Sequence, residues 1–313
     1  MSVGSELYRA HNLFQAGQNQ YYPLYVPGGK TFYVAPSTYT AVGGVAASDG
    51  NDGESPQTPL ATISQAHTNC VAGRHDTICL IGGTHTPSSA VTISKNYVRV
   101  VSMVPYAATI AGPGIIVDAD GVEFAGLRFT DTASTNALKF ADSTDTTGGH
   151  VHHCKFIGAA DASAVGIVVG ENSSGNDAAE VIIENCYFTE WNGGAVTIFG
   201  SYCQFKDNFI KAPTGSTCMT LGDYGTAAAV GNRDGLVIAD CRFLGASTAC
   251  TSLGVTIAGA EGNTGLYVLE GCFFGHLGDN SNDGVTTADR HPEGIGINYY
   301  GTAGDTDPDI VAG

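Results

Sequence analysis

The segment GHVHHCKF (149–156) has a pattern that recurs without gaps in five other places, and this recurrence is the main evidence for the fold. The other copies are VEFAGLRF (122–129), VIIENCYF (181–188), CQFKDNFI (203–210), LVIADCRF (236–243) and YVLEGCFF (267–274). The last position of each copy holds Phe129, Phe156, Phe188, Ile210, Phe243 or Phe274. The spacing between copies varies while the pattern within them does not, which is typical of a solenoid with loops of unequal length.

Two further columns in the repeat predict side chains that face a common interior. Two residues before the aromatic position stand Leu127, Cys154, Cys186, Asn208, Cys241 and Cys272, and five before it stand Phe124, Val151, Ile183, Phe205, Ile238 and Leu269. Positions three apart face opposite sides of a regular strand, so a bend must lie between these columns. That position holds Gly126, His153, Asn185, Asp207, Asp240 and Gly271, of which most tolerate left-handed backbone. We expect a corner there.

Second strands are expected at similar offsets after each copy. They are ALKF (137–140), GIVV (166–169), AVTIFG (195–200), GVTIAG (254–259) and GIGINYY (294–300). Two earlier segments, TICLIGGTH (77–85) and YVRVVSMVP (97–105), fit more loosely and bring the expected number of rungs to about eight. The sequence therefore predicts an all-β protein, a single-stranded parallel β-helix.

The N-terminal part of this pattern resembles a known architecture. FYVAPSTYT (32–40), SDGNDGESPQTPLATISQAH (48–67) and HDTICLIGGTHT (75–86) resemble the start of pectate-lyase-like right-handed β-helix proteins. The resemblance implies a right-handed coil, an extended strand and a helix near residues 59–70 that caps the N-terminal end. We expect an anchoring arm at residues 1–30, the strand and cap at 31–75, and the β-helix with a C-terminal tail at 76–313.

Composition and charge exclude several classes of partner. The formal net charge is −17, with 13 Lys and Arg against 30 Asp and Glu, so the protein should repel phosphate backbones and most acidic polymers at a distance. Nucleic acid is therefore not expected as a partner. No apolar run is long enough to span a bilayer, so membrane insertion is not expected either. Residues 1–20 do not read as a secretory signal, and the nine cysteines are therefore expected to be buried thiols.

Acid–base and metal chemistry have a few candidate residues. His152, Glu184 and Lys206 are expected in one outward line on adjacent rungs, either as a catalytic group or as exposed cross-strand pairs. Enzymes that resemble pectate lyases use calcium-binding carboxylates beside an arginine or lysine that acts as base. This chain offers the carboxylates Asp118, Asp120, Glu123 and Asp131 near the basic residues Arg128 and Lys155. No lyase catalytic motif matches, so no such role is carried over.

Two other clusters invite a metal interpretation. His150 and His152 would share a strand face beside His153, but solvated outward histidines are the simpler interpretation. The run DGNDG (49–53) lacks the spacing and closing Glu of an EF-hand, so a turn is expected. We therefore expect no metal site and no cofactor, with calcium as the one ion that the resemblance leaves open.

Apolar residues at outward positions predict a contact surface. One outward column contains Tyr187, Phe209 and Phe273 with Arg128, Lys155 and Arg242, and a second contains Ile182, Val237 and Val268. Such a stripe needs a cover, which is either a loop of the same chain, another subunit or a sugar. The N-terminal arm adds Tyr8, Phe14, Tyr21 and Tyr22 as further contact residues.

The favoured hypothesis for function combines these expectations. Rods of this kind usually work outside cells, yet no export signal is evident, and a bacteriophage virion protein assembled in the host cytoplasm reconciles the two. The hypothesis is a non-enzymatic, trimeric capsid decoration or head-fibre protein whose arm binds other virion proteins and whose surface stabilises the particle or contacts a cell-surface polysaccharide. The alternatives are a polysaccharide lyase, hydrolase or tailspike-type depolymerase, and a secreted extracellular adhesin.

Overall fold

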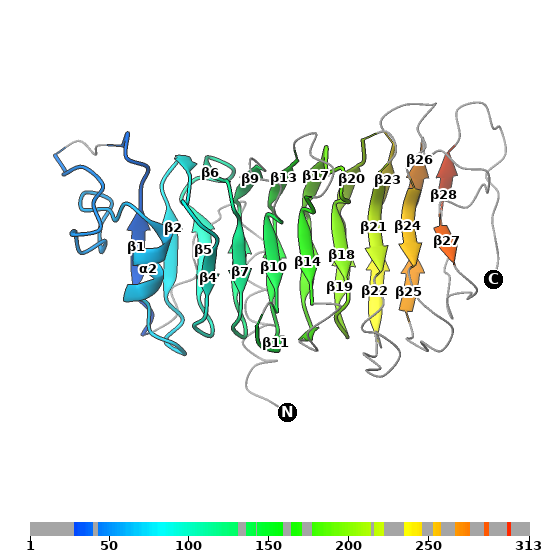
Figure 1. The fold of residues 1–313 in the computed structure, drawn as a ribbon, viewed down its shortest axis with the longest axis horizontal. Coiled ribbons are helices and arrows are strands. Elements are labelled where there is room, and N and C mark those ends of the chain that lie inside the picture. The colour runs from blue at the N-terminus through cyan, green and yellow to red at the C-terminus, as the bar shows by residue number, and fades with distance from the viewer. Residues whose placement is uncertain are drawn as a thin grey trace, which may run out of the picture.

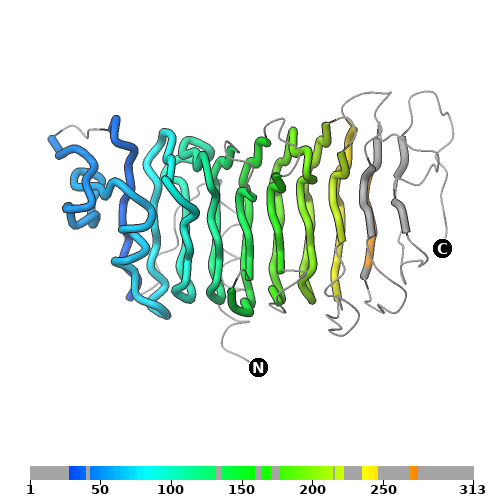
Figure 2. The backbone as a smooth tube through the Cα atoms, in the orientation of Figure 1, coloured from blue at the N-terminus to red at the C-terminus, as the bar shows by residue number. Residues whose placement is uncertain are grey.

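A computed structural model describes the chain over residues 28–39, 43–130, 136–141, 143–158, 164–170, 177–213, 216–221, 235–245, 253–257, 267–275, 285–287 and 299–301. Its strands stand side by side in chain order along the long axis of a rod, as Figure 1 shows. Each turn of the chain adds one parallel strand to each of three sheets, so the fold is a parallel β-helix as the sequence predicts. Figure 2 follows the backbone from one rung to the next.

Sheet I is the first sheet that each coil enters. It consists of β1 (Thr31–Val34), β2 (Thr77–Leu80), β5 (Arg99–Ser102), β8 (Glu123–Ala125), β12 (His150–His152), β16 (Ile182–Glu184), β19 (Gln204–Lys206), β22 (Leu236–Ala239) and β25 (Tyr267–Glu270).

Sheet II follows after the corner. It consists of β3 (Gly83–His85), β6 (Ala108–Ala111), β9 (Arg128–Thr130), β13 (Lys155–Ile157), β17 (Tyr187–Thr189), β20 (Phe209–Lys211), β23 (Arg242–Leu244), β26 (Phe273–Gly275) and β28 (Tyr299–Gly301).

Sheet III completes each coil. It consists of β4 (Val91–Ile93), β7 (Ile115–Val117), β10 (Leu138–Phe140), β14 (Ile167–Val169), β18 (Val196–Ile198), β21 (Thr217–Leu221), β24 (Leu253–Ile257) and β27 (Val285–Thr287). A small two-stranded sheet, β11 (Thr146–Thr147) with β15 (Ala178–Ala179), lies in the turn that leads back to sheet I. The predicted count of about eight rungs stays a prediction, because parts of the later coils lie outside the described residues.

The expected corner between sheets I and II is present in all six copies of the repeat. The backbone angle φ lies between 52° and 66° at Gly126, His153, Asn185, Asp207, Asp240 and Gly271. A left-handed residue bends the chain sharply, so the two inward columns on either side both reach the interior. The sequence prediction of a bend inside each repeat is confirmed.

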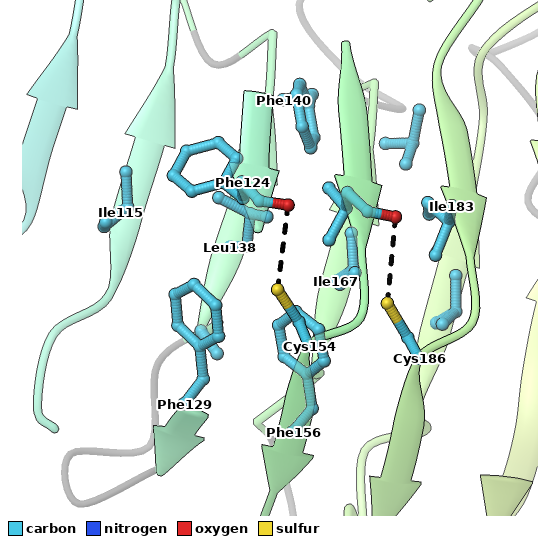
Figure 3. Packing of buried hydrophobic residues seen from close by; sticks show 14 of the residues in the cluster. Ile115, Phe124, Phe129, Leu138, Phe140, Cys154, Phe156, Ile167, Ile183 and Cys186 are labelled. Carbon is cyan, nitrogen blue, oxygen red and sulfur yellow. Dashed lines mark hydrogen bonds between the residues drawn. The ribbon is translucent and has the colours of Figure 1, made fainter. Parts of the chain in front are cut away.

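The interior is built from stacked side chains of the same type. The rings of Phe129 and Phe156 are parallel with centroids 4.7 Å apart, and Phe188 follows 4.8 Å from Phe156. All three are buried, and Figure 3 shows the first two beside Cys154 and Cys186. Burying one such ring contributes roughly 1.5–3 kcal/mol, so the aromatic column stabilises every rung it crosses.

The cysteine column consists of buried thiols, as expected. The eight cysteines in the described part of the chain are all free and buried. Figure 3 shows the Cys154 thiol donating to the carbonyl of Phe124, and the Cys186 thiol donates to the carbonyl of Val151 in the same way. The sulfur-to-oxygen distance is 3.7 Å in both. Asn208 interrupts the column, and its side-chain amide accepts a hydrogen bond from the Cys186 amide and donates one to the Ile183 carbonyl.

A short helix, α2 (Ile63–Asn69), packs against β1, β2 and β4 at the N-terminal end of the rod. Thr62 caps its first turn, and Asp49 accepts hydrogen bonds from the amide and hydroxyl of Thr62. The ammonium of Lys95 binds the carbonyls of His67, Thr68 and Cys70 at the other end. Asp49, which begins the DGNDG run, therefore braces the helix from within the chain.

One predicted strand belongs to a different sheet. The sequence pattern predicts segment 294–300 beside ALKF and GIVV in sheet III, but Tyr299 and Tyr300 pair with Phe273 and Phe274 in sheet II. The last strand of sheet III is instead Val285–Thr287, paired with β24. This strand has one apolar residue in its sequence, so its signal is weaker than that of the segment that follows it.

Candidate binding face and histidine cluster

The outward column of sheet II forms an exposed aromatic stripe along the rod. The strand register places Arg128, Lys155, Tyr187, Phe209, Arg242 and Phe273 on consecutive rungs. The rings of Tyr187 and Phe209 stack with centroids 4.9 Å apart and planes 12° apart. Tyr187 is 37% exposed and Phe273 38% exposed, so solvent reaches these rings. This column, together with Lys211 on the same sheet, is called the sheet II face below.

The described strands of sheet II contain cations but no carboxylate, although the protein is strongly acidic. The cations are Arg128, Lys155, Lys211 and Arg242. Among the residues that the structure describes, none of these four cations forms an ion pair with a carboxylate. Lys155 lies instead over the ring of Tyr106, 4.4 Å from its centroid.

The second predicted column lies on sheet I, on the other side of the corner. Ile182, Gln204, Val237 and Val268 follow one another in register and are each half-buried. The two predicted columns therefore belong to different faces of the rod. The same sheet I column continues through His150 and Glu123 to Arg99, where it becomes polar.

The polar part of sheet I is a compact network of side chains from neighbouring strands. Arg99 forms two hydrogen bonds of 2.8 Å with the carboxylate of Glu123. His152 Nε2 lies 3.1 Å from Glu123 Oε1, and His152 Nδ1 lies 3.0 Å from His153 Nδ1. The His152 side chain is only 4% exposed. We call Arg99, Glu123, His150, His152, His153 and Glu184 the histidine cluster.

Electrostatics within the cluster favour ionised carboxylates and a neutral His153. Burial opposes ionisation of Glu123, but hydrogen bonds from His152 and Arg99 hold its pKa well below its usual range. The hydrogen bond from His150, at 3.1 Å, likewise lowers the pKa of Glu184. Burial, with the neighbouring ring of His152, lowers the pKa of His153 to about 4.

The strand register aligns His152, Glu184 and Lys206 as predicted, but no hydrogen bond joins these three side chains to one another. The three residues occupy neighbouring positions on β12, β16 and β19. His152, however, binds Glu123 and His153, while Glu184 binds His150. The expectation of solvated outward histidines is wrong for His152, because neighbouring side chains bury it at an outward position.

The acidic residues suggested by the lyase resemblance are dispersed. Asp118 binds the amide and hydroxyl of Ser143, and Asp120 binds Thr147, all in turns on the far side of sheet I from the corner. Arg128 lies on the sheet II face. Asp131 and the arm residues Tyr8, Phe14, Tyr21 and Tyr22 lie outside the described residues.

The described stretches contain neither a metal-binding cluster nor a membrane-spanning helix. No group of three or more His, Cys, Asp and Glu there is arranged to hold a metal ion. No helix in these stretches is long and apolar enough to cross a bilayer.

Sequence reasoning missed the two residues that organise the cluster and its neighbour face. Arg99 belongs to a segment that matches the repeat only loosely, and Tyr106 lies in a turn. Extending the outward column from His150 upstream through Glu123 would have found Arg99, because the register continues unbroken.

Comparison with known proteins supports the architecture. No family model and no curated protein sequence matches this chain. A pectin methylesterase from Aspergillus niger aligns with a TM-score of 0.58 at 13% identity, covering 90% of this chain and 88% of that one. Escherichia coli YbhC aligns with a TM-score of 0.54 at 10% identity, covering 82% and 75%.

A pectin methylesterase variant in complex with a hexasaccharide aligns similarly, with a TM-score of 0.51 at 12% identity, covering 89% of this chain and 91% of that one. Identities this low carry information about fold only. The chain therefore shares the parallel β-helix fold of these proteins.

Proposed function

We propose that this protein binds an acidic polysaccharide along the sheet II face. The observation that carries the proposal is the contrast between a net charge of −17 and a face with four cations and no carboxylate in its described strands. The net charge repels an acidic polymer at a distance, so attraction at contact must come from these local cations.

The side chains on this face suit the two kinds of surface that an acidic sugar presents. Exposed rings of Tyr187 and Phe273, with the half-buried ring of Phe209, can pack against the apolar faces of sugar rings. Arg128 and Arg242 can bind carboxylates or sulfates through two parallel hydrogen bonds, and Lys155 and Lys211 add point charges. Because these groups recur on successive rungs, a linear polymer lying along the rod would meet several of them at once.

The histidine cluster is a weaker candidate for this function. His152 is buried, and Glu123 is fully engaged by Arg99 and His152, so neither is placed to reach a large substrate. The half-buried pair of His150 and Glu184 is the part of the cluster that a sugar could contact. The depolymerase alternative predicts new reducing ends or unsaturated products from an acidic polysaccharide, and Glu184→Ala would abolish them.

The test is binding of the full chain to polygalacturonate and to neutral dextran, measured by calorimetry at two salt concentrations. We expect binding to polygalacturonate alone, weakening as salt rises. Arg242→Ala should weaken it by about tenfold or more, because a charge-assisted hydrogen bond contributes roughly 1.5–3 kcal/mol. The matched control is Tyr202→Ala, an aromatic residue 56% exposed away from this face, which should leave binding unchanged. Equal losses in both variants would overturn the proposal.

The same face has a competing use as a contact between copies of the chain. The sequence predicts a trimeric, non-enzymatic capsid decoration or head-fibre protein, and this role stays a prediction. Light scattering on the wild type and on a Tyr187→Ala, Phe273→Ala double variant separates the two uses. A wild-type trimer that dissociates in the double variant assigns the face to assembly and counts against polysaccharide binding there.

A further inference from the structure

The histidine cluster contains a hydrogen-bond chain whose geometry limits where its protons can lie. The Glu123 carboxylate, held by Arg99, can only accept, so His152 Nε2 carries a hydrogen and donates to it. A neutral His152 then has a bare Nδ1. The contact of 3.0 Å between the two Nδ1 atoms therefore requires His153 Nδ1 to donate to His152.

This chain accommodates one additional proton but not two. If His152 becomes an imidazolium, its Nδ1 donates, and His153 can still accept by moving its own hydrogen to Nε2. A second proton leaves a hydrogen on both Nδ1 atoms, which then face each other at hydrogen-bond distance as two donors on two cations. The contact must then break.

We propose that the Glu123–His152–His153 chain is an acid-sensitive lock that holds the corner of the rod at His153 against sheet I and releases it when both imidazoles are protonated. Loss of this contact should affect the backbone at the corner itself. His153 has φ of 52°, a left-handed backbone conformation that costs free energy for residues other than glycine, so its backbone depends on local contacts to stay in place.

The charged groups around the lock act in opposing directions. His150 and His152 on β12 oppose protonation of His153, and Glu184 on β16 favours it. Arg99 on β5 and Glu123 on β8 are paired with each other beside His152. Lys206 on β19 and Asp207 at the next corner lie beyond Glu184 and interact with it. The net effect on His153 is a pKa lowered to about 4, chiefly by burial.

The sign of the pH effect follows from that direction. A released His153 would titrate near 6.5, so between pH 6.5 and 4 the open form binds more protons than the closed form. The closed form is therefore fully favoured above pH 6.5 and loses stability as the pH falls toward 4. Opening should become more frequent by up to about tenfold for each pH unit in this window.

The chain offers a matched reporter and a matched control in one column. Cys154, buried, directly follows His153, whereas Cys186, also buried, directly follows Asn185 at the same left-handed corner position. A pyridyl disulfide reagent that reacts in acid labels exposed thiols, and peptide mass spectrometry assigns each label. We expect labelling of Cys154 relative to Cys186 to rise about tenfold or more between pH 6 and pH 4.

The decisive variant is His153→Asn, because Asn already occupies this corner position at residue 185. We expect the variant to lose the acid-induced rise in Cys154 labelling while keeping its labelling at pH 7. His153→Gly, which places at this corner the residue type found at Gly126 and Gly271, is the second variant should Asn fold poorly. An unchanged rise in either folded variant, or no rise in the wild type, would overturn the lock.

Discussion

The outward faces of sheet I and sheet II meet at one corner, and they differ in whether their charged side chains are paired. On sheet I, Arg99 is paired with Glu123, and Glu184 with His150, so these four polar groups satisfy one another within the chain. On sheet II, Arg128, Lys155 and Arg242 follow the same register without a carboxylate partner in the described residues.

This contrast indicates that the charges of sheet I stabilise the fold, whereas those of sheet II are available to a binding partner. Substituting one member of a buried charged pair is strongly destabilising because it leaves the other charge buried without a partner. Exposed cations contribute little to stability and can bind an anion from solution. Substitutions on the two faces should therefore differ in kind, with stability affected on sheet I and binding on sheet II.

The largest difference is expected from Glu123→Ala compared with Arg242→Ala. Removing Glu123 leaves Arg99 and the buried His152 without their shared partner, so the free energy of unfolding should fall by about 3 kcal/mol. Arg242→Ala should change it by less than about 0.5 kcal/mol. Urea unfolding at pH 7 measures both, and equal effects would remove the distinction between the faces.

A smaller effect on the free energy of unfolding is expected at the corner between sheets I and II. Asp207 has φ of 53°, so Asp207→Val should cost about 1–2 kcal/mol of unfolding free energy, because a β-branched side chain is strained there. Asp207→Gly removes the strain and should be close to neutral. The same denaturation assay checks this pair of variants. A Val variant as stable as the Gly variant would show that the corner is not under this constraint.

Disrupting the stacked rings of Tyr187 and Phe209 on sheet II should destabilise the protein less. Tyr187→Ala removes one ring from the stack with Phe209 and should lower the free energy of unfolding by roughly 1 kcal/mol. Tyr187→Phe keeps the stack and serves as the control. A loss above that of Glu123→Ala would mean that sheet II is structural after all.

The smallest effect concerns the pH dependence of Glu184. Its pKa is lowered chiefly by the hydrogen bond from His150, so it stabilises the fold above the pKa of the unfolded chain and loses that effect as the pH falls through its own. His150→Gln should raise the Glu184 titration midpoint toward its ordinary value, as NMR would record. An unchanged midpoint would show that His150 is not the main cause.

Sequence reasoning predicted the architecture because each rung repeats the same physical requirements. The corner column was found through Gly126, Asn185 and Asp207, whose types tolerate left-handed backbone, and the interior through the Phe and Cys columns. Strand β21 was missed, since Cys218, Met219 and Leu221 are all buried and the strand shows no simple alternation.

Gly121 shows a further constraint: a Cβ atom there would lie 2.4 Å from the ring of Tyr97.

The candidate sites were less accessible from sequence. The outward columns followed from the repeat, so the aromatic residues of sheet II were predicted by position. The burial of His152 was not, because it depends on partners such as Glu123, 29 residues away in sequence, and on Arg99, in a segment that barely matches the repeat. Side-chain partnership across rungs is set by rotamers and loops, which the repeat does not encode.

Hydroxyl-radical footprinting of the full chain with and without polygalacturonate tests polysaccharide binding at sheet II most directly. The oxidation rates of Tyr187 and Phe273 should fall several-fold at saturation, while Tyr97 and Tyr202, exposed elsewhere on the rod, should keep theirs. Unchanged oxidation of Tyr187 at saturation, or protection of Tyr202 in its place, would contradict the account.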